Sequence, residues 1–279
     1  MIESLKGGKK LSETPKSQSL MTGIFLIAGI LGAASVGQAP SRRPNLVVAV
    51  DSLVVGSRVN GVWKAPGPDF ASRFSNLSLR SFGIGTVGKQ TIRSKPAFEE
   101  VDNATYLSGL SSPSSAFLHG GTPRVPRTVD ELDRTSPTYK RILSAFLVRK
   151  GVANPAPNIR QLIRADLDGD GTKEVIIEAR SRDDFKNSPD ASEWNASDYS
   201  IVLLRSMHGK EVREFSLEFV SKQVSAPLDI RRLRAVADID GDGRMEIVTD
   251  SSGFEWQSGT LWKYRKGVVT KVVSSYGGH

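Results

Sequence analysis

The chain contains no cysteine among its 279 residues. This absence excludes disulfide bonds, thiol nucleophiles, and zinc or iron–sulfur sites held by cysteine. Histidine is also scarce, since only His119, His208 and His279 are present, and this disfavours a histidine-rich metal site. The remaining composition, with 38% hydrophobic and 24% charged residues, is typical of a globular protein and excludes a collagen-like, coiled-coil or wholly disordered chain.

Positive charge is only slightly in excess over negative charge. Basic residues outnumber acidic ones by 38 to 30, which gives a formal net charge of +8. Such an excess permits an anionic partner without requiring one. Arg231, Arg232 and Arg234 alternate into an expected strand and have no aromatic residues between them, so we expect no nucleic-acid site.

The N-terminal segment predicts export. Residues 1–20 are polar and contain four lysines, and an apolar run follows from Met21 to Ala39. A basic segment before an apolar run that ends in small residues is typical of a signal peptide. The run is also about long enough to span a bilayer if it is not cleaved. We therefore expect residues 1–39 to be a signal peptide or an N-terminal membrane anchor, and the remainder to be extracytoplasmic, whether secreted, periplasmic or membrane-anchored.

The next part of the chain predicts three further regions. Residues 40–106 are expected to form a small β-rich unit, because β-branched runs flank the hairpin signal Asn60-Gly61. Residues 107–135 are rich in serine, proline and glycine, which predicts a linker or long surface loop. A helix is expected over 137–150, because a serine and a proline open a segment with apolar residues at helical spacing.

The C-terminal part contains the nonapeptide D-x-D-G-D-G-x-x-E twice. Calcium binds about six to eight oxygen ligands, and carboxylates at alternate positions can converge on one ion where glycines allow a tight turn. We therefore predict two calcium sites. The expected ligands of the first are Asp166, Asp168, Asp170, the backbone carbonyl of Thr172 and Glu174, and those of the second are Asp238, Asp240, Asp242, the carbonyl of Arg244 and Glu246.

The spacing does not fit an EF-hand. An EF-hand needs a glutamate at position 12 of its loop, which is Ile177 or Thr249 here. Apolar residues after each ninth-position glutamate indicate strands rather than an exiting helix. The alternative is an acidic solvated turn without metal, and the mutual repulsion of the clustered carboxylates disfavours it.

The two nonapeptides, each flanked by apolar strands, resemble the calcium loops of FG-GAP or VCBS repeats, which are the blades of integrin-type β-propellers. In that family the loop joins the first two strands of a four-stranded blade, and its aspartates bind calcium. The resemblance implies these roles for the loop residues named above. Two departures are the glutamate at the ninth position, which is commonly aspartate, and the absence of the Phe-Gly and Gly-Ala-Pro sequences from the two repeats.

Periodicity predicts two sets of four strands, within repeats at about 159–219 and 232–279. Since a closed propeller has about four to eight blades, two blades do not complete one. We expect a mainly β fold in which two propeller-like blades accompany a small N-terminal β unit and one capping helix. The expected strands are 159–165, 174–180, 199–205 and 211–219 in the first repeat, and 232–237, 246–250, 259–264 and 268–274 in the second.

Aromatic residues near the two loops are candidates for ligand binding. Aromatic rings stack on sugars, but they also fill the space between packed sheets. The sequence leaves both roles open. The candidate residues are Trp194 in the first repeat and Phe254, Trp256, Trp262 and Tyr264 in the second.

Together these features predict an exported, calcium-binding, FG-GAP-like protein that acts as a non-catalytic structural, adhesion or ligand-binding module at the cell envelope. Its expected partners are a cell-surface glycan, an anionic envelope polymer or a protein. The alternative is an extracytoplasmic hydrolase or lyase acting on polysaccharide, with the repeats as an accessory domain. The unassigned acids Glu99, Glu100, Asp183 and Asp184 leave paired-carboxylate chemistry open, and a pocket joining Glu99 or Asp183 with aromatic residues would favour an enzyme.

Overall fold

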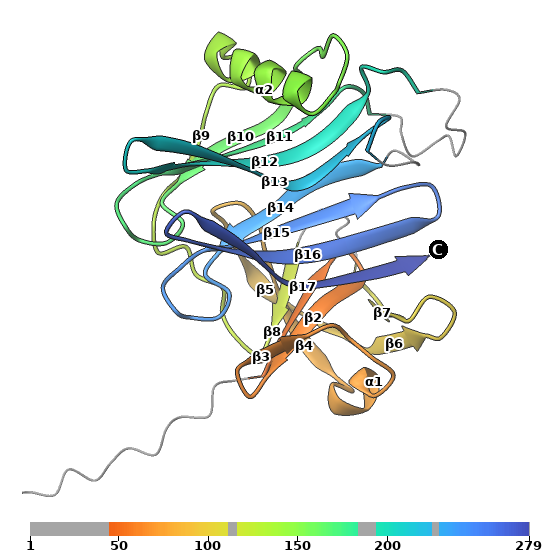
Figure 1. The fold of residues 1–279 in the computed structure, drawn as a ribbon. Coiled ribbons are helices and arrows are strands. Elements are labelled where there is room, and N and C mark those ends of the chain that lie inside the picture. Colours follow the sequence, from red (N-terminus) through yellow and green to blue (C-terminus); the bar gives the residue numbers. More distant parts are fainter. Residues whose placement is uncertain (1–44, 111–115, 184–193, 225–228, 279) are drawn as a thin grey trace, which may run out of the picture. The chain divides into compact units, whose positions relative to one another are not determined.

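Three antiparallel sheets, packed face against face, form most of the described chain (Figure 1). This computed structural model describes residues 45–110, 116–183, 194–224 and 229–278. The expected signal peptide or anchor at 1–39 lies outside the described residues. Neither of the two described helices is long and apolar enough to cross a membrane.

The first sheet has the strand order β5-β4-β8-β1-β2-β7-β6, and β3 pairs with β2. The expected hairpin at Asn60-Gly61 is confirmed, since Val59 pairs with Val62 and both turn residues have positive φ, 51° and 83°. A short helix, α1 (Phe70–Arg73), packs Phe70 on this sheet. The strands are β1 (Leu46–Val50), β2 (Leu53–Val59), β3 (Val62–Lys64), β4 (Leu77–Phe82), β5 (Val87–Ser94), β6 (Pro96–Glu99), β7 (Ala104–Leu107) and β8 (Ala116–His119).

The segment expected to be a linker, 107–135, contains two strands. β8 lies between β1 and β4 in the first sheet, and β9 (Val129–Glu131) pairs with β10 in the second. Phe117 and Leu118 are buried, so this part of the segment belongs to the core. Strands of three or four residues are too short to show a clear alternation in the sequence, whereas the surrounding proline and glycine residues favour a loop.

The second and third sheets contain the eight strands that the two repeats predict, with the order β13-β12-β11-β10-β9 in the second and β14-β15-β16-β17 in the third. In each repeat, four consecutive strands pair as an antiparallel meander. The observed bounds of β10 and β11 equal the expected ones, while the other strands are longer. The strands are β10 (Ile159–Ala165), β11 (Glu174–Arg180), β12 (Tyr199–His208), β13 (Glu211–Ser221), β14 (Ile230–Ala237), β15 (Glu246–Ser252), β16 (Trp256–Arg265) and β17 (Val268–Gly278).

The expected helix is confirmed as α2 (Pro137–Arg149). Its apolar side chains Leu143 and Leu147 pack on the second sheet against residues such as Ile177. Ser136 precedes the helix, but its side chain makes no capping hydrogen bond. The helix therefore depends on its packing against the sheet more than on its cap.

The third sheet lies between the first and the second. Val248 and Leu261 pack against the first sheet, whereas Ile247 and Trp262 pack against the second. The third sheet therefore contributes apolar side chains from both of its faces to the core. The structure thus confirms a mainly β fold with a capping helix, but the described residues do not establish a propeller.

Candidate metal centres

Two acidic clusters occupy equivalent loops, one between β10 and β11 and the other between β14 and β15. In each cluster, three carboxylates offer oxygen atoms that all lie within 4.8 Å of one another. Either arrangement could hold a metal ion. The first cluster consists of Asp166, Asp168 and Glu174, and the second of Asp238, Asp240 and Glu246.

The first aspartate of each loop organises the turn. The two oxygens of Asp166 accept hydrogen bonds from the backbone N–H groups of Gly169 at 2.7 Å and Gly171 at 3.1 Å. These glycines have φ values of 82° and 88°, which side-chain-bearing residues rarely adopt. Asp238 accepts the same pair of bonds in the second loop, at 2.7 and 3.1 Å. The repeated motif therefore gives the same local structure twice.

Glu174 begins β11 and is buried, with only 1% of its surface exposed. Its Oε2 accepts a hydrogen bond from the Leu167 N–H at 2.9 Å, whereas its Oε1 has no hydrogen-bond partner. Burial, helped by the charges of Asp168 and Asp170, raises the pKa of this carboxyl to about 7. A buried carboxylate oxygen without a donor is costly, and a bound cation would remove that cost.

Glu246 is equally buried, but it has a cationic neighbour. Its Oε2 accepts a hydrogen bond from the Ile239 N–H at 2.8 Å, and its Oε1 lies 3.2 Å from the Lys263 Nζ. Lys263 also donates to Asp240 Oδ2 at 2.7 Å, and Arg58 Nη1 lies 3.6 Å from the same oxygen. Burial raises the pKa of Glu246 to about 7, although Lys263 acts in the opposite direction.

The fourth predicted carboxylate of each loop lies outside the cluster of three. Asp170 and Asp242 are exposed, and they accept hydrogen bonds from the backbone N–H groups of Thr172 at 2.7 Å and Arg244 at 2.9 Å. Each loop therefore brings together three of its four predicted carboxylates, and the fourth holds the backbone of the turn.

Arg127 supports both loops, although no pattern in the sequence selects it. Its guanidinium donates to the backbone oxygens of Asp166 at 2.6 Å, Leu167 at 3.0 Å and Gly243 at 2.9 Å. The first two belong to the first loop and the third to the second loop. No local pattern reveals such contacts, because the partners are far away in the sequence.

Replacing Arg127 by lysine is expected to lower the free energy of unfolding by about 1–3 kcal/mol, because one ammonium group cannot replace a planar donor set that reaches both loops. Urea denaturation would measure the change. The matched control is Arg149→Lys, whose exposed side chain ends the helix α2, and we expect a change within about 0.5 kcal/mol. Equal effects of the two substitutions would contradict the assigned role of Arg127.

Three of the five aromatic candidates are packed in the interior. Trp262 and Tyr264 lie between the second and third sheets, and Trp194 packs against Val220 and Ile230. Phe254 is 52% exposed. The fifth, Trp256, stacks on Tyr276 with a ring-centroid separation of 5.6 Å.

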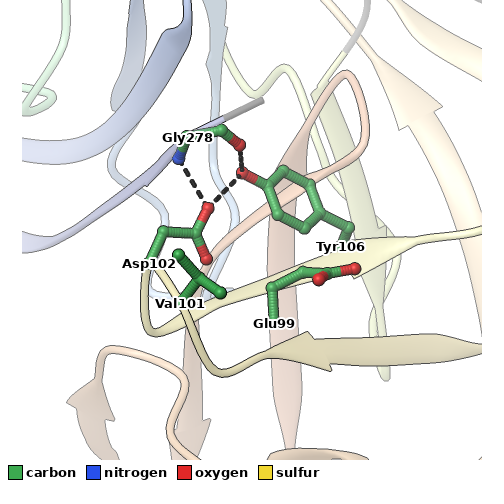
Figure 2. Close-up of a pocket in the computed structure, with 5 residues that line it drawn as sticks. All are labelled: Glu99, Val101, Asp102, Tyr106 and Gly278. Atoms are coloured by element: carbon green, nitrogen blue, oxygen red, sulfur yellow. Dashed lines mark hydrogen bonds between the residues drawn. The ribbon is translucent and has the colours of Figure 1, made fainter.

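Glu99 lines a cavity of about 420 Å³ together with Asp102 and Tyr106 (Figure 2). Asp102 accepts hydrogen bonds from the N–H groups of Ala104 at 3.1 Å and Gly278 at 2.5 Å. The Tyr106 hydroxyl lies 3.0 Å from Asp102 Oδ2 and 2.5 Å from the Gly278 oxygen. Asp102 and Tyr106 thus anchor the end of β17 to the first sheet.

The remaining acids suggested for catalysis do not join this cavity. Asp183 forms ion pairs with Arg160 and Arg180. Glu100 is exposed in the turn after β6, and Asp184 lies outside the described residues. The structure therefore places Glu99 and Asp183 in separate surroundings.

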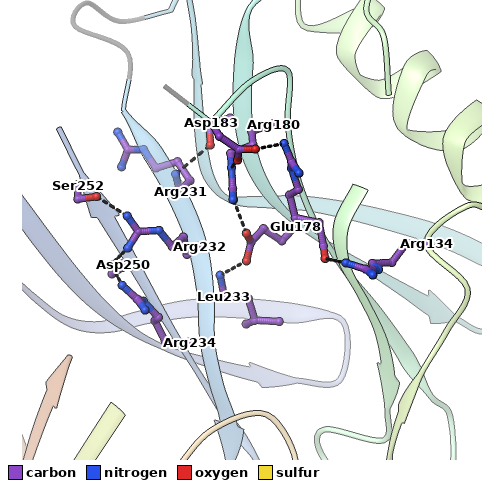
Figure 3. A network of polar contacts seen from close by, with 12 residues as sticks. Arg134, Glu178, Arg180, Asp183, Arg231, Arg232, Leu233, Arg234, Asp250 and Ser252 are labelled. Carbon is purple, nitrogen blue, oxygen red and sulfur yellow. Dashed lines mark hydrogen bonds and ion pairs between the residues drawn. The ribbon is translucent and has the colours of Figure 1, made fainter. Parts of the chain in front are cut away.

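A buried polar network lies at the opposite ends of the strands from the acidic clusters (Figure 3). Glu178 on β11 accepts hydrogen bonds from the Leu233 N–H at 2.8 Å and from Arg180 at 2.7 Å. Asp250 on β15 accepts from Arg234 at 2.7 Å and Arg232 at 3.1 Å. Glu178 therefore links the second sheet to Leu233 of the third, while Asp250 pairs with arginines of its own sheet.

Comparison with known proteins provides no relative, since no family model, curated protein or solved structure matches the chain. The expected resemblance to FG-GAP repeats therefore stays a prediction from the sequence of the two loops and their flanking strands. Any assignment of function must therefore be based on the geometry of the site.

Proposed function

We propose that the chain is an exported calcium-binding module whose acidic loops hold calcium as a structural ion. The observation that carries this proposal is Glu174, whose buried Oε1 lacks a hydrogen-bond donor within a cluster of carboxylates. Calcium is a hard cation that prefers oxygen ligands and tolerates varied geometry. In the first cluster Asp166, Asp168 and Glu174 would hold it.

A bound calcium ion would supply positive charge that links the two ends of the β10–β11 loop. Its protein ligands already have a defined position, because Asp166 is fixed by two glycine N–H groups and Glu174 by Leu167. Asp168 Oδ2 also accepts a hydrogen bond from the Lys266 N–H at 2.7 Å. Since Lys266 lies between β16 and β17, a metal at the first cluster would stabilise the contact between the second and third sheets.

The proposed place of action is the cell envelope. Support comes from the basic segment and apolar run at residues 1–39, which favour export or anchoring. Two four-stranded meanders packed face to face, each with its acidic loop after the first strand, support the interpretation that they are FG-GAP-like blades. In this role the protein is non-catalytic and binds a cell-surface glycan, an anionic envelope polymer or another protein.

Thermal unfolding in chelator and in millimolar calcium tests the metal assignment. At a calcium concentration of about ten times a sub-millimolar dissociation constant, the ion adds about 1.4 kcal/mol of stability. For a protein of this size we expect the midpoint to rise by about 3–5 °C. The substitution Glu174→Gln should abolish the part of the rise that the first loop contributes, because it removes the charge of the buried carboxylate.

The matched control is Asp69→Asn, an exposed carboxylate at the start of α1. This variant should keep the full calcium-dependent rise. Absence of any rise in the unmodified protein, together with no heat of calcium binding in calorimetry, would refute the proposal.

The second candidate is an extracytoplasmic hydrolase or lyase acting on polysaccharide, and the cavity that joins Glu99 with Tyr106 favours it. Hydrolysis of a glycosidic bond ordinarily needs two carboxyl groups with free oxygens. The other carboxylate lining this cavity, Asp102, is already engaged with Ala104, Tyr106 and Gly278. This candidate therefore ranks second. Polysaccharide cleavage that Glu99→Gln abolishes would establish it.

A further inference from the structure

We propose that the two acidic loops are not equivalent, and that the Lys263 side chain is the cation of the second loop. The protein then binds one calcium ion, at the first loop. This inference rests on the proposed function, because it assumes that the first loop binds calcium. It replaces the two equal sites that the repeated sequence motif predicts.

Lys263 lies on β16 and reaches into the second loop. Its Nζ is 2.7 Å from Asp240 Oδ2, 3.2 Å from Glu246 Oε1 and 3.7 Å from Asp242 Oδ2. One ammonium group therefore contacts three of the four carboxylates of the motif. It donates a hydrogen bond to Asp240 Oδ2, whereas its contacts with Glu246 and Asp242 are ion pairs, and Glu246 Oε1 has no hydrogen-bond partner.

The first loop has no such cation. Among the described residues, no lysine or arginine side chain forms an ion pair with Asp168, Asp170 or Glu174. The nearest guanidinium belongs to Arg127, whose Nε lies 3.7 Å from Asp166 Oδ2 and whose three hydrogen bonds go to backbone oxygens. The carboxylates of the first loop therefore lack the charge compensation that the second loop contains.

Strand register shows which residue makes the difference. In the third sheet Ile247 pairs with Trp262, so the adjacent Glu246 faces Lys263. In the second sheet Val175 pairs with Arg205, so Glu174 faces Ser206 at the equivalent position. A serine hydroxyl carries no charge, whereas a lysine in this place neutralises the cluster. This substitution places an ammonium group inside the second loop, where Arg58 Nη1 also lies 3.6 Å from Asp240 Oδ2, and leaves the first loop without one.

Calcium at the second loop would meet two obstacles. The ammonium occupies the space between Asp240 and Glu246, and its positive charge repels a divalent cation at short range. Lys263 would have to leave its three carboxylates before the ion could enter. We expect the affinity of the second loop for calcium to be at least about tenfold weaker than that of the first, so that it stays empty when the first is full.

Isothermal titration of the purified full chain with calcium chloride, after treatment with chelator, tests this inference through the number of ions bound. The unmodified protein should bind one calcium ion. The variant Lys263→Ser, which gives the second loop the residue of the first, should bind two. The matched control Arg244→Ser removes a different positive charge from the same loop and should still bind one, because Arg244 contacts only Asp242 among the loop carboxylates.

A second pair of variants identifies the loop that is occupied. Asp168→Asn should abolish calcium binding in the unmodified background and should leave one ion bound in the Lys263→Ser background. Circular dichroism of each variant in chelator confirms that the fold is retained.

The outcomes distinguish this inference from the proposed function. Two ions bound to the unmodified protein would overturn the inference and leave the proposed function intact. One ion bound to both the unmodified protein and Lys263→Ser would also overturn the inference, because the lysine would then not exclude the metal. If the unmodified protein binds one ion and Asp168→Asn still binds one, the occupied site is not the first loop, and the inference is overturned. No calcium bound to any variant would overturn the proposed function as well.

Discussion

Replacing Trp262 by alanine is expected to lower the free energy of unfolding by about 3–5 kcal/mol. The side chain is 9% exposed and packs between the second and third sheets. Its indole N–H donates to the Thr249 hydroxyl at 2.8 Å, and that hydroxyl donates to Glu218 on β13 at 2.9 Å. Alanine would leave a cavity between the sheets and would interrupt this chain of hydrogen bonds.

Urea denaturation measures the loss, with Phe254→Ala as the control. Phe254 is 52% exposed, so its replacement should change stability by no more than about 0.5 kcal/mol. Similar small effects of both substitutions would contradict the packing role of Trp262. In that case its role as a binding residue for a sugar would regain support.

Replacing Asp250 by alanine should be about as damaging, with a loss of about 3–5 kcal/mol. Its side chain is 5% exposed and lies between Arg232 and Arg234. Arg234 is itself buried, and it also pairs with Asp51 at 2.9 Å. Removal of one partner from a buried ion pair leaves a charge without full compensation, which costs more than the pair itself contributes.

The control for this substitution is Asp183→Ala in the same network. Asp183 is 56% exposed, and its ion pairs are screened by solvent, so a change of at most about 1 kcal/mol is expected. Chemical denaturation of both variants at pH 7 makes the comparison. If Asp250→Ala were no worse than Asp183→Ala, the buried ion pairs of Asp250 would not stabilise the fold.

Local patterns in the sequence were sufficient to predict several of the loops, strands and helices. The glycines and the acidic motif define both loops, and the bounds of β10 and β11 follow because the first loop ends one strand and begins the other. The helix α2 also follows from apolar residues at helical spacing. These features depend on neighbours in the chain, which is why one sequence suffices to predict them.

Features that depend on distant partners could not be predicted. β8 is recognisable only because β1 and β4 pair with it from both sides. Arg127 contacts loops that lie far along the chain. Only the pairing of the strands shows that Lys263 and Ser206 occupy equivalent positions opposite Glu246 and Glu174. The sequence therefore predicted two equal loops, and the difference between them became visible only with the strand pairing.

The position of the third sheet has a consequence for the order in which the protein can fold. Residues of the first sheet such as Val48 and Val55 are covered by Val248 and Leu261, which are synthesised much later. The Ser275 hydroxyl also donates to the Val54 oxygen at 2.6 Å, so β17 completes this contact. Until β14–β17 emerges from the ribosome, one apolar face of the first sheet has no cover. A chaperone that holds the nascent chain would protect that face during this interval.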